Sequence, residues 1–422
     1  MFQSVETTYF PSLTDIGKAQ KQLSGVVRKT PLELHKGFSE EFDAEIWLKR
    51  EDLQEVRSYK IRGAYNKMSG LSKDEVKNGI VCASAGNHAQ GVAQSCFILN
   101  IQGTIFMPTP TPKQKVKKVK QFGQNLVKVV LIGDSFDDAS NAAQKYCKEQ
   151  NATFIPPFDD KKVIEGQGTI GMEILHQFAG QVDYLFMPVG GGGLSAGVSS
   201  VFRHVSPGTK LIGVEPLGAP AMKESIEKGE RVMLKSIDKF VDGAAVKKVG
   251  KLNFDICKQT LTAVSTVHEG KVCEMMLRLY NEDAMVVEPA GALTLAVLDQ
   301  YREEIKGKTV VCVISGSNND ISRTAEIQER ALLYRGIKHY FIISFPQRAG
   351  ALREFVTDIL GTTDDIVYFE YEKKGNQETG SAVVGIELKS PKDLKPLMTR
   401  MNMHNFSGEY LNEKPELLRY II

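Results

Sequence analysis

The sequence has few of the features that mark membrane, secreted or metal-stapled proteins. Its six cysteines lie far apart and none forms a CxxC pair, so neither a structural zinc site nor a disulfide framework is indicated. No apolar run reaches the ~18 residues that a membrane-spanning helix needs. The first ten residues, MFQSVETTYF, lack the basic stretch and apolar core of a secretory signal. These absences predict a cytoplasmic protein without a membrane partner.

The charge balance gives no reason to expect nucleic acid as a partner. The 422 residues carry 53 basic and 51 acidic side chains, a formal net charge of +2. A basic run between Lys113 and Lys120 follows Thr111-Pro112 and predicts a helix with a solvated face and with Val116 and Val119 turned inward. With 42% hydrophobic and 25% charged residues, the chain is typical of a globular protein of two or three domains.

Apolar runs that are typical of strands alternate with helical patterns over most of the chain, which predicts an α/β fold with parallel sheets. In such sheets ligands bind beyond the carboxyl ends of the strands. The loops after the runs are therefore the places to look for chemistry. The runs are residues 80–83, 104–107, 126–132, 184–189, 211–214 and 309–314.

Residues 58–64, with the sequence S-Y-K-I-R-G-A, place Lys60 where a loop meets a predicted helix. A solvated lysine has a pKa of ~10.4, so an amine that forms an imine with an aldehyde must be desolvated or lie beside another cation. Arg57 and Arg62 could contribute that charge, and Tyr59 offers an aromatic face. The alternative is an ordinary surface lysine near a helix start.

Four glycines, residues 190–193, follow the apolar run 184–189 and precede Leu194. Such a loop lets backbone N–H groups converge on an anion at the start of the next helix. No basic residue occurs between residues 188 and 202, which excludes a nucleoside-triphosphate loop with its lysine. Two alternatives remain at this point: a dinucleotide site of the G-x-G-x-x-A type with Glu215 on the ribose, and glycines that serve only a tight turn.

Two further loops are polar: residues 84–91 (S-A-G-N-H-A-Q-G) and residues 315–318 (S-G-S-N). Together with the lysine segment, the glycine loop and V-E-P-A-G-A at residues 287–292, they resemble the fold type II family of pyridoxal-phosphate enzymes. That group contains the tryptophan synthase β chain, threonine dehydratases and serine racemases. The resemblance implies a catalytic domain of two parallel-sheet α/β subdomains, spanning residues 1–335.

The resemblance also implies pyridoxal 5′-phosphate as cofactor and a role for each matching residue. Lys60 would hold the cofactor as an imine and then act as the base at the substrate Cα, with Ser84 as the second catalytic residue. The other implied cofactor contacts are Tyr59 on the ring, Asn87 on its 3′-oxygen, Ser315 at the pyridine nitrogen, and Gly190, Gly191, Gly192, Gly193 and Leu194 on the phosphate. Ser84 and His88 would bind the substrate carboxylate, and Glu288 would line the same site.

The residue types favour elimination over racemisation. A neutral Ser315 at the pyridine nitrogen makes the ring a weaker electron sink than an aspartate would, so loss of a β-hydroxyl is favoured over a long-lived carbanion. Serine racemases carry a serine where this chain has Ala85, which has no proton to give. Some relatives bind a divalent metal near Glu215, but Ala219 and Ala221 stand where acidic residues are expected. We therefore expect no tight Mg²⁺ site, and a monovalent ion stays open.

The last ~90 residues have a different pattern, about the size of one small domain. A helix over residues 321–335 is expected to lead into a linker at Arg335-Gly336. The order βαββα with a closing strand then predicts an α+β ferredoxin-like domain, residues 336–422. Its predicted strands are residues 338–345, 366–371 and 382–388, its first helix spans residues 350–360, and its second starts at Ser390-Pro391.

Residues 345–355 (F-P-Q-R-A-G-A-L-R-E-F) resemble the start of the ACT-like regulatory module of biosynthetic threonine dehydratases. The resemblance implies a carbon-nitrogen lyase that converts L-threonine to 2-oxobutanoate and ammonia, the first step from threonine to isoleucine, with isoleucine as inhibitor. L-Serine is expected as a slower substrate, and a homo-oligomer, a dimer or tetramer, as the assembly. The alternatives are a catabolic serine/threonine dehydratase, a nicotinamide-dependent oxidoreductase, a non-catalytic amino-acid sensor, and a C-terminal appendage used only for oligomerisation.

Overall fold

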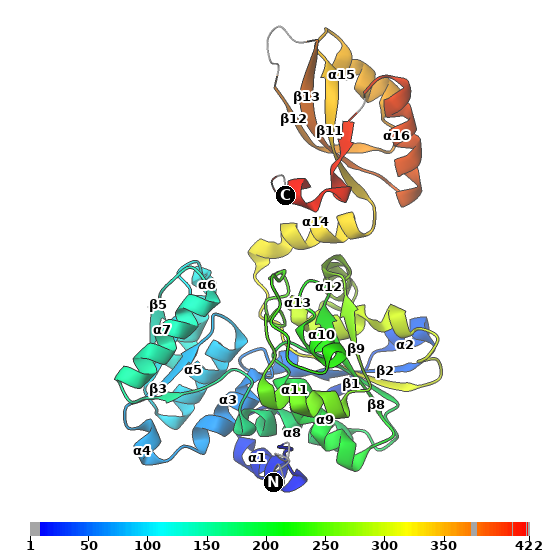
Figure 1. Cartoon of the computed structure of the whole chain (residues 1–422). Coiled ribbons are helices and arrows are strands. Elements are labelled where there is room, and N and C mark those ends of the chain that lie inside the picture. The colour runs from blue at the N-terminus through cyan, green and yellow to red at the C-terminus, as the bar shows by residue number, and fades with distance from the viewer. Residues whose placement is uncertain (1–8, 373–377, 407, 419, 421–422) are drawn as a thin grey trace, which may run out of the picture. The chain divides into compact units, whose positions relative to one another are not determined.

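The computed structural model describes residues 9–372, 378–406, 408–418 and 420. The chain forms two compact units, Met1–Asp320 and Ile321–Ile422, which are described separately below (Figure 1). Most of the N-terminal segment considered above, and residues 373–377 between two predicted strands, lie outside the described residues. Within the described part, no helix is both long enough and apolar enough to span a membrane.

The larger sheet of the N-terminal unit has the strand order β1-β2-β10-β7-β8-β9. Only β1 and β2 pair antiparallel; the other neighbours are parallel. The strands are β1 (Leu32–Leu34), β2 (Glu45–Arg50), β7 (Tyr184–Pro188), β8 (Lys210–Pro216), β9 (Ala263–Val267) and β10 (Thr309–Ile314). Apolar side chains of α8 (Lys161–Gln177) and α9 (Gly193–Val205) pack on one face, while α13 (Pro289–Ala296) contacts β7, β8 and β10.

The smaller sheet, β5-β4-β3-β6, is parallel throughout. Its strands are β3 (Ile80–Ala83), β4 (Gly103–Met107), β5 (Val127–Leu131) and β6 (Thr153–Phe154). One apolar cluster joins it to α3 (Lys60–Ser69), α5 (Asn87–Leu99) and α6 (Lys113–Gly123), and a second joins it to α7 (Phe136–Glu149). Val119 is fully buried in the first cluster, with Val116 packed against it, as the pattern predicts, although Pro112 caps α6 rather than opening it.

The prediction of two parallel-sheet α/β subdomains is therefore confirmed, and each of the six apolar runs is a strand. The pattern missed β1, β2, β6 and β9. β6 has only two residues. β9 is mostly half-buried, and β2 combines apolar with charged residues, so neither strand is a continuous apolar run. The remaining helices of this unit are α1 (Leu13–Leu23), α2 (Lys36–Phe42), α4 (Lys73–Val76), α10 (Ala221–Lys228), α11 (Lys251–Thr260) and α12 (Glu269–Asp283).

Close backbone contacts fix the start of α3. A Cβ on Gly91 of α5 would lie 3.2 Å from the Lys60 carbonyl carbon, and one on Gly166 of α8 would lie 2.6 Å from the Arg62 carbonyl oxygen. Only a residue without a side chain allows helices to approach this closely. Two helices, α5 and α8, therefore pack closely against the first turn of α3, which contains Lys60.

The C-terminal unit has an antiparallel sheet in the order β12-β13-β11-β14. Its strands are β11 (Lys338–Pro346), β12 (Asp365–Tyr371), β13 (Thr379–Glu387) and β14 (Gly408–Tyr410). The helices are α14 (Thr324–Tyr334), α15 (Ala351–Glu354), α16 (Leu394–Met403) and α17 (Pro415–Leu418). This arrangement confirms the ferredoxin-like prediction, including the closing strand.

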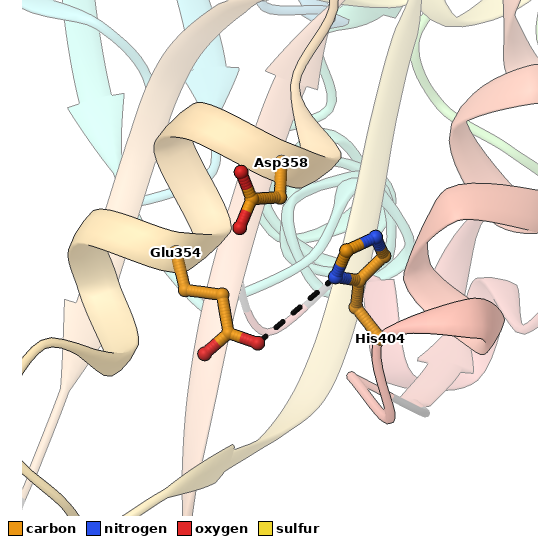
Figure 2. A group of neighbouring side chains, drawn as sticks. All are labelled: Glu354, Asp358 and His404. Atoms are coloured by element: carbon orange, nitrogen blue, oxygen red, sulfur yellow. Dashed lines mark ion pairs between the residues drawn. The ribbon is translucent and has the colours of Figure 1, made fainter.

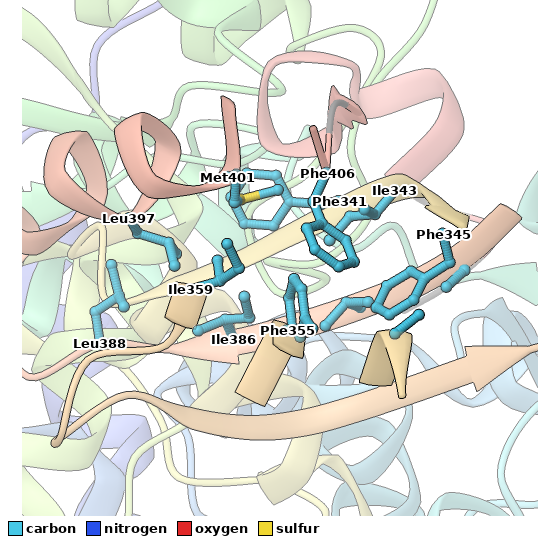
Figure 3. Packing of buried hydrophobic residues seen from close by; sticks show 13 residues of the cluster. Phe341, Ile343, Phe345, Phe355, Ile359, Ile386, Leu388, Leu397, Met401 and Phe406 are labelled. Atoms are coloured by element: carbon cyan, nitrogen blue, oxygen red, sulfur yellow. The ribbon is translucent and has the colours of Figure 1, made fainter. Parts of the chain in front are cut away.

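The core of this unit lies between the sheet and its helices (Figure 3). Phe345, Phe355 and Phe406 meet there, with ring centroids 5.1–5.4 Å apart. The predicted helix 350–360 is present but irregular. Its first part is α15, and a π-helical turn follows directly over Phe355–Ile359. Ser390 caps the second helical segment through the Lys392 N–H, and Pro391 follows it, as expected.

Candidate active site

Backbone pairing brings the lysine loop against the loop that follows β10. Ser58 and Gly316 form an isolated β-bridge, and the Tyr59 N–H donates to the Ser315 carbonyl at 3.2 Å. Lys60 is the first residue of α3, directly after this bridge. Lys60 and Ser315, distant in the sequence, are therefore held next to each other by main-chain contacts.

The Lys60 amine lies in an apolar, aromatic environment. Its Nζ donates to the Pro157 carbonyl at 2.9 Å and lies 5.4 Å from the Tyr59 ring centroid and 6.0 Å from that of Phe158. Burial lowers the pKa of Lys60 to about 8, and the nearby Glu288 carboxylate acts in the opposite direction. The neutral, nucleophilic form of this amine is thus far more populated near neutral pH than that of a solvated lysine.

The neighbouring arginines do not supply this effect. Arg62 is fully buried and its guanidinium donates to Glu51 and Glu173 at 2.7–2.9 Å. The pKa of Lys60 is shifted by burial and by Glu288 and not by Arg57 or Arg62, so the suggestion that these cations contribute is wrong. Desolvation lowers it instead.

The glycine loop forms a tight turn at the start of α9. Gly192 has φ of 89°, a conformation that favours glycine, and a Cβ there would lie 2.8 Å from the Met222 Cε. The Phe158 ring packs on Gly191, where a Cβ would lie 2.3 Å from it. Since the first N–H groups of a helix have no partner within it, this turn presents free amide donors to an anion.

Asn87, at the start of α5, lies in a hydrogen-bonded group with residues from two other segments. Its Nδ2 donates to Glu288 Oε1 at 2.7 Å, and its Oδ1 accepts from Asn318 Nδ2 at 2.7 Å. Burial raises the pKa of Glu288 to about 7, with Asp242 adding to the rise. The polar loop after β3, the loop after β10 and the V-E-P-A-G-A segment thus meet at one place.

Ser84 and Ala85 lie in the loop after β3, and His88 is the second residue of α5. The Ser84 Oγ accepts from the Gly86 N–H at 3.2 Å. His88 is buried, and its Nε2 lies 3.0 Å from the Ile155 carbonyl, which identifies it as the protonated nitrogen. Burial, together with the Lys60 charge, lowers the pKa of His88 to about 3, so the ring is neutral.

Three residues of this site were not assigned by the sequence analysis: Pro157, Phe158 and Asn318. Pro157 and Phe158 follow β6, whose two residues are too short to be recognised as a strand. The one feature of the sequence that could have pointed to them is that they follow a parallel strand. Asn318 belongs to the S-G-S-N motif, but its role depends on side chains that meet it from other segments.

Acidic side chains at two places in the structure were considered as possible metal ligands. Glu215 accepts from the N–H groups of Met222 and Lys223 at 2.7 and 2.9 Å, so both of its carboxylate oxygens serve as a helix cap. In the C-terminal unit, Glu354, Asp358 and His404 lie close together on the surface, with His404 Nδ1 4.0 Å from Glu354 (Figure 2). Glu354 also pairs with Arg348, so a cation competes for the same carboxylate.

Comparison with known families gives two matches that together cover most of the chain. Residues 23–316 match the family described as pyridoxal-phosphate dependent enzyme. Residues 329–421 match the one described as the C-terminal regulatory domain of threonine dehydratase.

The chain is also similar to individual proteins over nearly its whole length. It is 54% identical over 410 residues to L-threonine dehydratase biosynthetic IlvA of Halalkalibacterium halodurans, covering 97% of this chain and 99% of that protein. It is 52% identical over 405 residues to the protein of the same name from Bacillus subtilis, covering 96% of each. Among solved structures, the processed form of threonine deaminase isoform 2 from Solanum lycopersicum matches with a TM-score of 0.71 and 39% identity, covering 76% of this chain and 95% of that one.

Proposed function

The chain belongs to the pyridoxal-phosphate-dependent enzyme family, and on that basis we propose that it is an L-threonine dehydratase that forms 2-oxobutanoate and ammonia. The observation that carries the proposal is the Lys60 amine, desolvated to a pKa of about 8 and held by main-chain contacts beside Ser315. The full-length similarity to biosynthetic threonine dehydratases gives the substrate class. A nicotinamide-dependent oxidoreductase does not account for such a lysine, and a non-catalytic sensor does not need one.

The residues of the site fit pyridoxal phosphate. The glycine turn before α9 offers free amide donors without any basic side chain between residues 188 and 202, which suits a phosphate held by main chain and helix dipole. Tyr59 and Phe158 present aromatic rings within 6.0 Å of the Lys60 amine, and Asn87 and Ser315 offer hydrogen bonds to the ring. These contacts are proposals that follow from the family and from where the side chains lie.

When bound, the cofactor withdraws electrons from the amino-acid Cα, so that a proton and then the β-hydroxyl can leave. Lys60 moves the Cα proton, since burial lowers the pKa of its amine to about 8 and so makes the neutral, basic form more accessible at physiological pH. The Ser84 hydroxyl and the neutral His88 ring are placed to orient the substrate carboxylate. Ala85 offers no proton on the opposite face, so the site favours elimination over racemisation. L-Serine is proposed as a slower substrate, because one methyl group separates the two by only ~1–3 kcal/mol.

We further propose that isoleucine inhibits the enzyme by binding the C-terminal domain, residues 336–422. The match of residues 329–421 to the regulatory domain of threonine dehydratase supports this. We also propose a homo-oligomer, a dimer or tetramer, and a cytoplasmic location. The location is consistent with six free cysteines, the state expected in a reducing compartment.

The test of the catalytic proposal compares Lys60→Ala with Lys67→Ala, which replaces a partly exposed lysine of the same helix that pairs with Asp160. Lys60→Ala should lower 2-oxobutanoate production at least ~10²–10⁴-fold, the usual contribution of a positioned acid or base. Lys67→Ala should retain activity. Turnover by Lys60→Ala close to that of the control would reject Lys60 as the catalytic amine.

Steady-state rates with threonine and serine, each with and without isoleucine, separate the remaining alternatives. A biosynthetic enzyme should prefer threonine and lose rate when isoleucine is added. Equal use of both substrates without any response to isoleucine would favour a catabolic serine/threonine dehydratase.

A further inference from the structure

Asn87, Glu288 and Asn318 close a ring of hydrogen bonds beside Lys60. Asn87 Nδ2 donates to Glu288 Oε1 at 2.7 Å, the Asn318 N–H donates to Glu288 Oε2 at 3.2 Å, and Asn318 Nδ2 donates to Asn87 Oδ1 at 2.7 Å. The three residues come from α5, the start of α13 and the loop after β10. Each side of the ring is thus set by a different part of the fold.

The ring fixes which atom of the Asn87 amide is a donor. Its oxygen accepts from Asn318 and its nitrogen donates to Glu288, so exchanging the two atoms would place oxygen against carboxylate and nitrogen against a donor. An amide nitrogen carries two hydrogens, and Glu288 is the acceptor that the structure shows for one of them. The second N–H is thereby fixed as a donor.

Asn318 is itself held in one orientation. Its Nδ2 donates to the Val56 carbonyl at 2.8 Å as well as to Asn87, so both of its N–H groups are used. An aspartate would turn an oxygen toward the Val56 carbonyl and the Asn87 oxygen. An alanine would leave the Asn87 oxygen without its donor. The geometry therefore requires a carboxamide at this position.

We propose that Asn318 is a positioning residue that acts through Asn87, fixing its amide so that the second N–H donates to the ionised ring oxygen of the cofactor. An ionised oxygen only accepts hydrogen bonds, so it is stabilised by the fixed N–H and repelled by a flipped amide oxygen. This inference rests on the proposed function, which supplies the cofactor. It assigns to Asn318 a role that neither the motif nor burial explains.

The experiment titrates cofactor-free protein with pyridoxal phosphate and follows the visible absorbance of the bound form. Asn318→Ala and Asn318→Asp should each weaken cofactor binding about tenfold to a hundredfold, the range for a hydrogen bond to a charged group. The visible band should also lose intensity to the near-ultraviolet band, because a protonated ring oxygen absorbs at shorter wavelength. Ser317→Ala is the matched control: its hydroxyl lies in the same loop and donates to the Asp52 carbonyl at 3.1 Å, away from Asn87.

A double-mutant cycle separates positioning from a general structural role. In an Asn87→Ala background the Asn318 substitutions should add little to the loss of affinity, because the amide they orient is gone. Additive losses, or Asn318 variants that match Ser317→Ala in affinity and spectrum, would overturn the proposal. Asn318→Asp keeps the size of the side chain and decides the question if Asn318→Ala does not fold. A wild-type protein that binds no pyridoxal phosphate would instead reject the proposed function.

Discussion

In the N-terminal unit, Arg62 lies buried between Glu51 and Glu173, and Lys49 is also buried with its amine 2.6 Å from Glu173. The C-terminal unit instead packs 13 apolar side chains between sheet and helices, and His339 is its buried polar side chain among the described residues. Buried charges are costly and must be paired, whereas apolar burial is stabilising by itself. The contrast shows that the first unit combines its apolar clusters with a buried network of paired charges, whereas the described interior of the second unit is almost wholly apolar.

The largest effect on stability is expected where a buried charge loses its partner. Arg62→Met should lower the free energy of unfolding of the N-terminal unit by ~3–5 kcal/mol, because it leaves Glu51 buried without its paired cation and Glu173 with Lys49 alone. Urea unfolding followed by circular dichroism measures this. The control is Lys228→Met, an exposed partner of Glu224, for which a change of ~0–1 kcal/mol is expected. Equal losses would remove the distinction between the two interiors.

A comparable change in the C-terminal unit should affect regulation and leave chemistry intact. Phe355→Ala removes a fully buried ring from the apolar core and should cost about 3 kcal/mol or more. Catalysis should persist while inhibition by isoleucine is lost, as measured by rate against isoleucine concentration. Val356→Ala, at a half-exposed neighbour, should retain inhibition. Inhibition that survives unfolding of this unit would place the effector site elsewhere.

Two glycines with nearly the same backbone conformation allow a matched test of the two units. Gly192 has φ of 89° and Gly350 has φ of 88°, and each caps a helix. Alanine at either position should cost ~1–2 kcal/mol of backbone strain. Only Gly192→Ala should also weaken pyridoxal-phosphate binding, because its Cβ meets Met222 while Gly350 faces open space. Equal cofactor affinity of the two variants would mean that the glycine turn does not shape the phosphate site.

The last expected effect is gradual and is spread over more than two pH units: a change in the pH dependence of stability at Glu288. The folded protein holds a proton there with a pKa of about 7, against an ordinary value of 4.5, so the folded state binds more protons in this window. The free energy of unfolding of the cofactor-free protein should therefore fall as pH rises from about 4.5 to about 7, with a slope of at most ~1.4 kcal/mol per pH unit. Glu288→Gln should flatten this slope, and the exposed Glu303→Gln should not. Thermal melts across that range provide the measurement, and an unchanged slope would contradict the assignment.

Much of the fold could be predicted because its strands are continuous apolar runs. The central strands β3, β4, β7, β8 and β10 are covered by helices on both faces, and a strand buried on both faces needs apolar residues at successive positions. β6 and β9 escaped detection because one is very short and the other is half-buried. The order of helices and strands in the C-terminal unit could be predicted from helix caps, turn residues and the alternation of apolar and polar residues. No motif with catalytic residues was needed.

The candidate site was predicted in part. Lys60, Asn87, the glycine loop and Ser315 could be named because each is a short motif at a strand end or helix start. The contacts of Pro157, Phe158 and Asn318 could not, because each depends on which segments meet in space. Arg62 misled for the same reason, since the chain turns its side chain toward Glu51 and Glu173.

Strand patterns, helix caps and glycine turns are local properties of the chain, so the amino-acid sequence alone indicates which residues are candidates for the chemistry and in what order the elements follow. How those residues behave depends on the tertiary structure. It lowers the pKa of Lys60 by burial, makes His88 neutral, and fixes the Asn87 amide through Glu288 and Asn318. Desolvation and hydrogen-bond partners depend on what surrounds a group in three dimensions, and those surroundings come from segments far apart in the sequence.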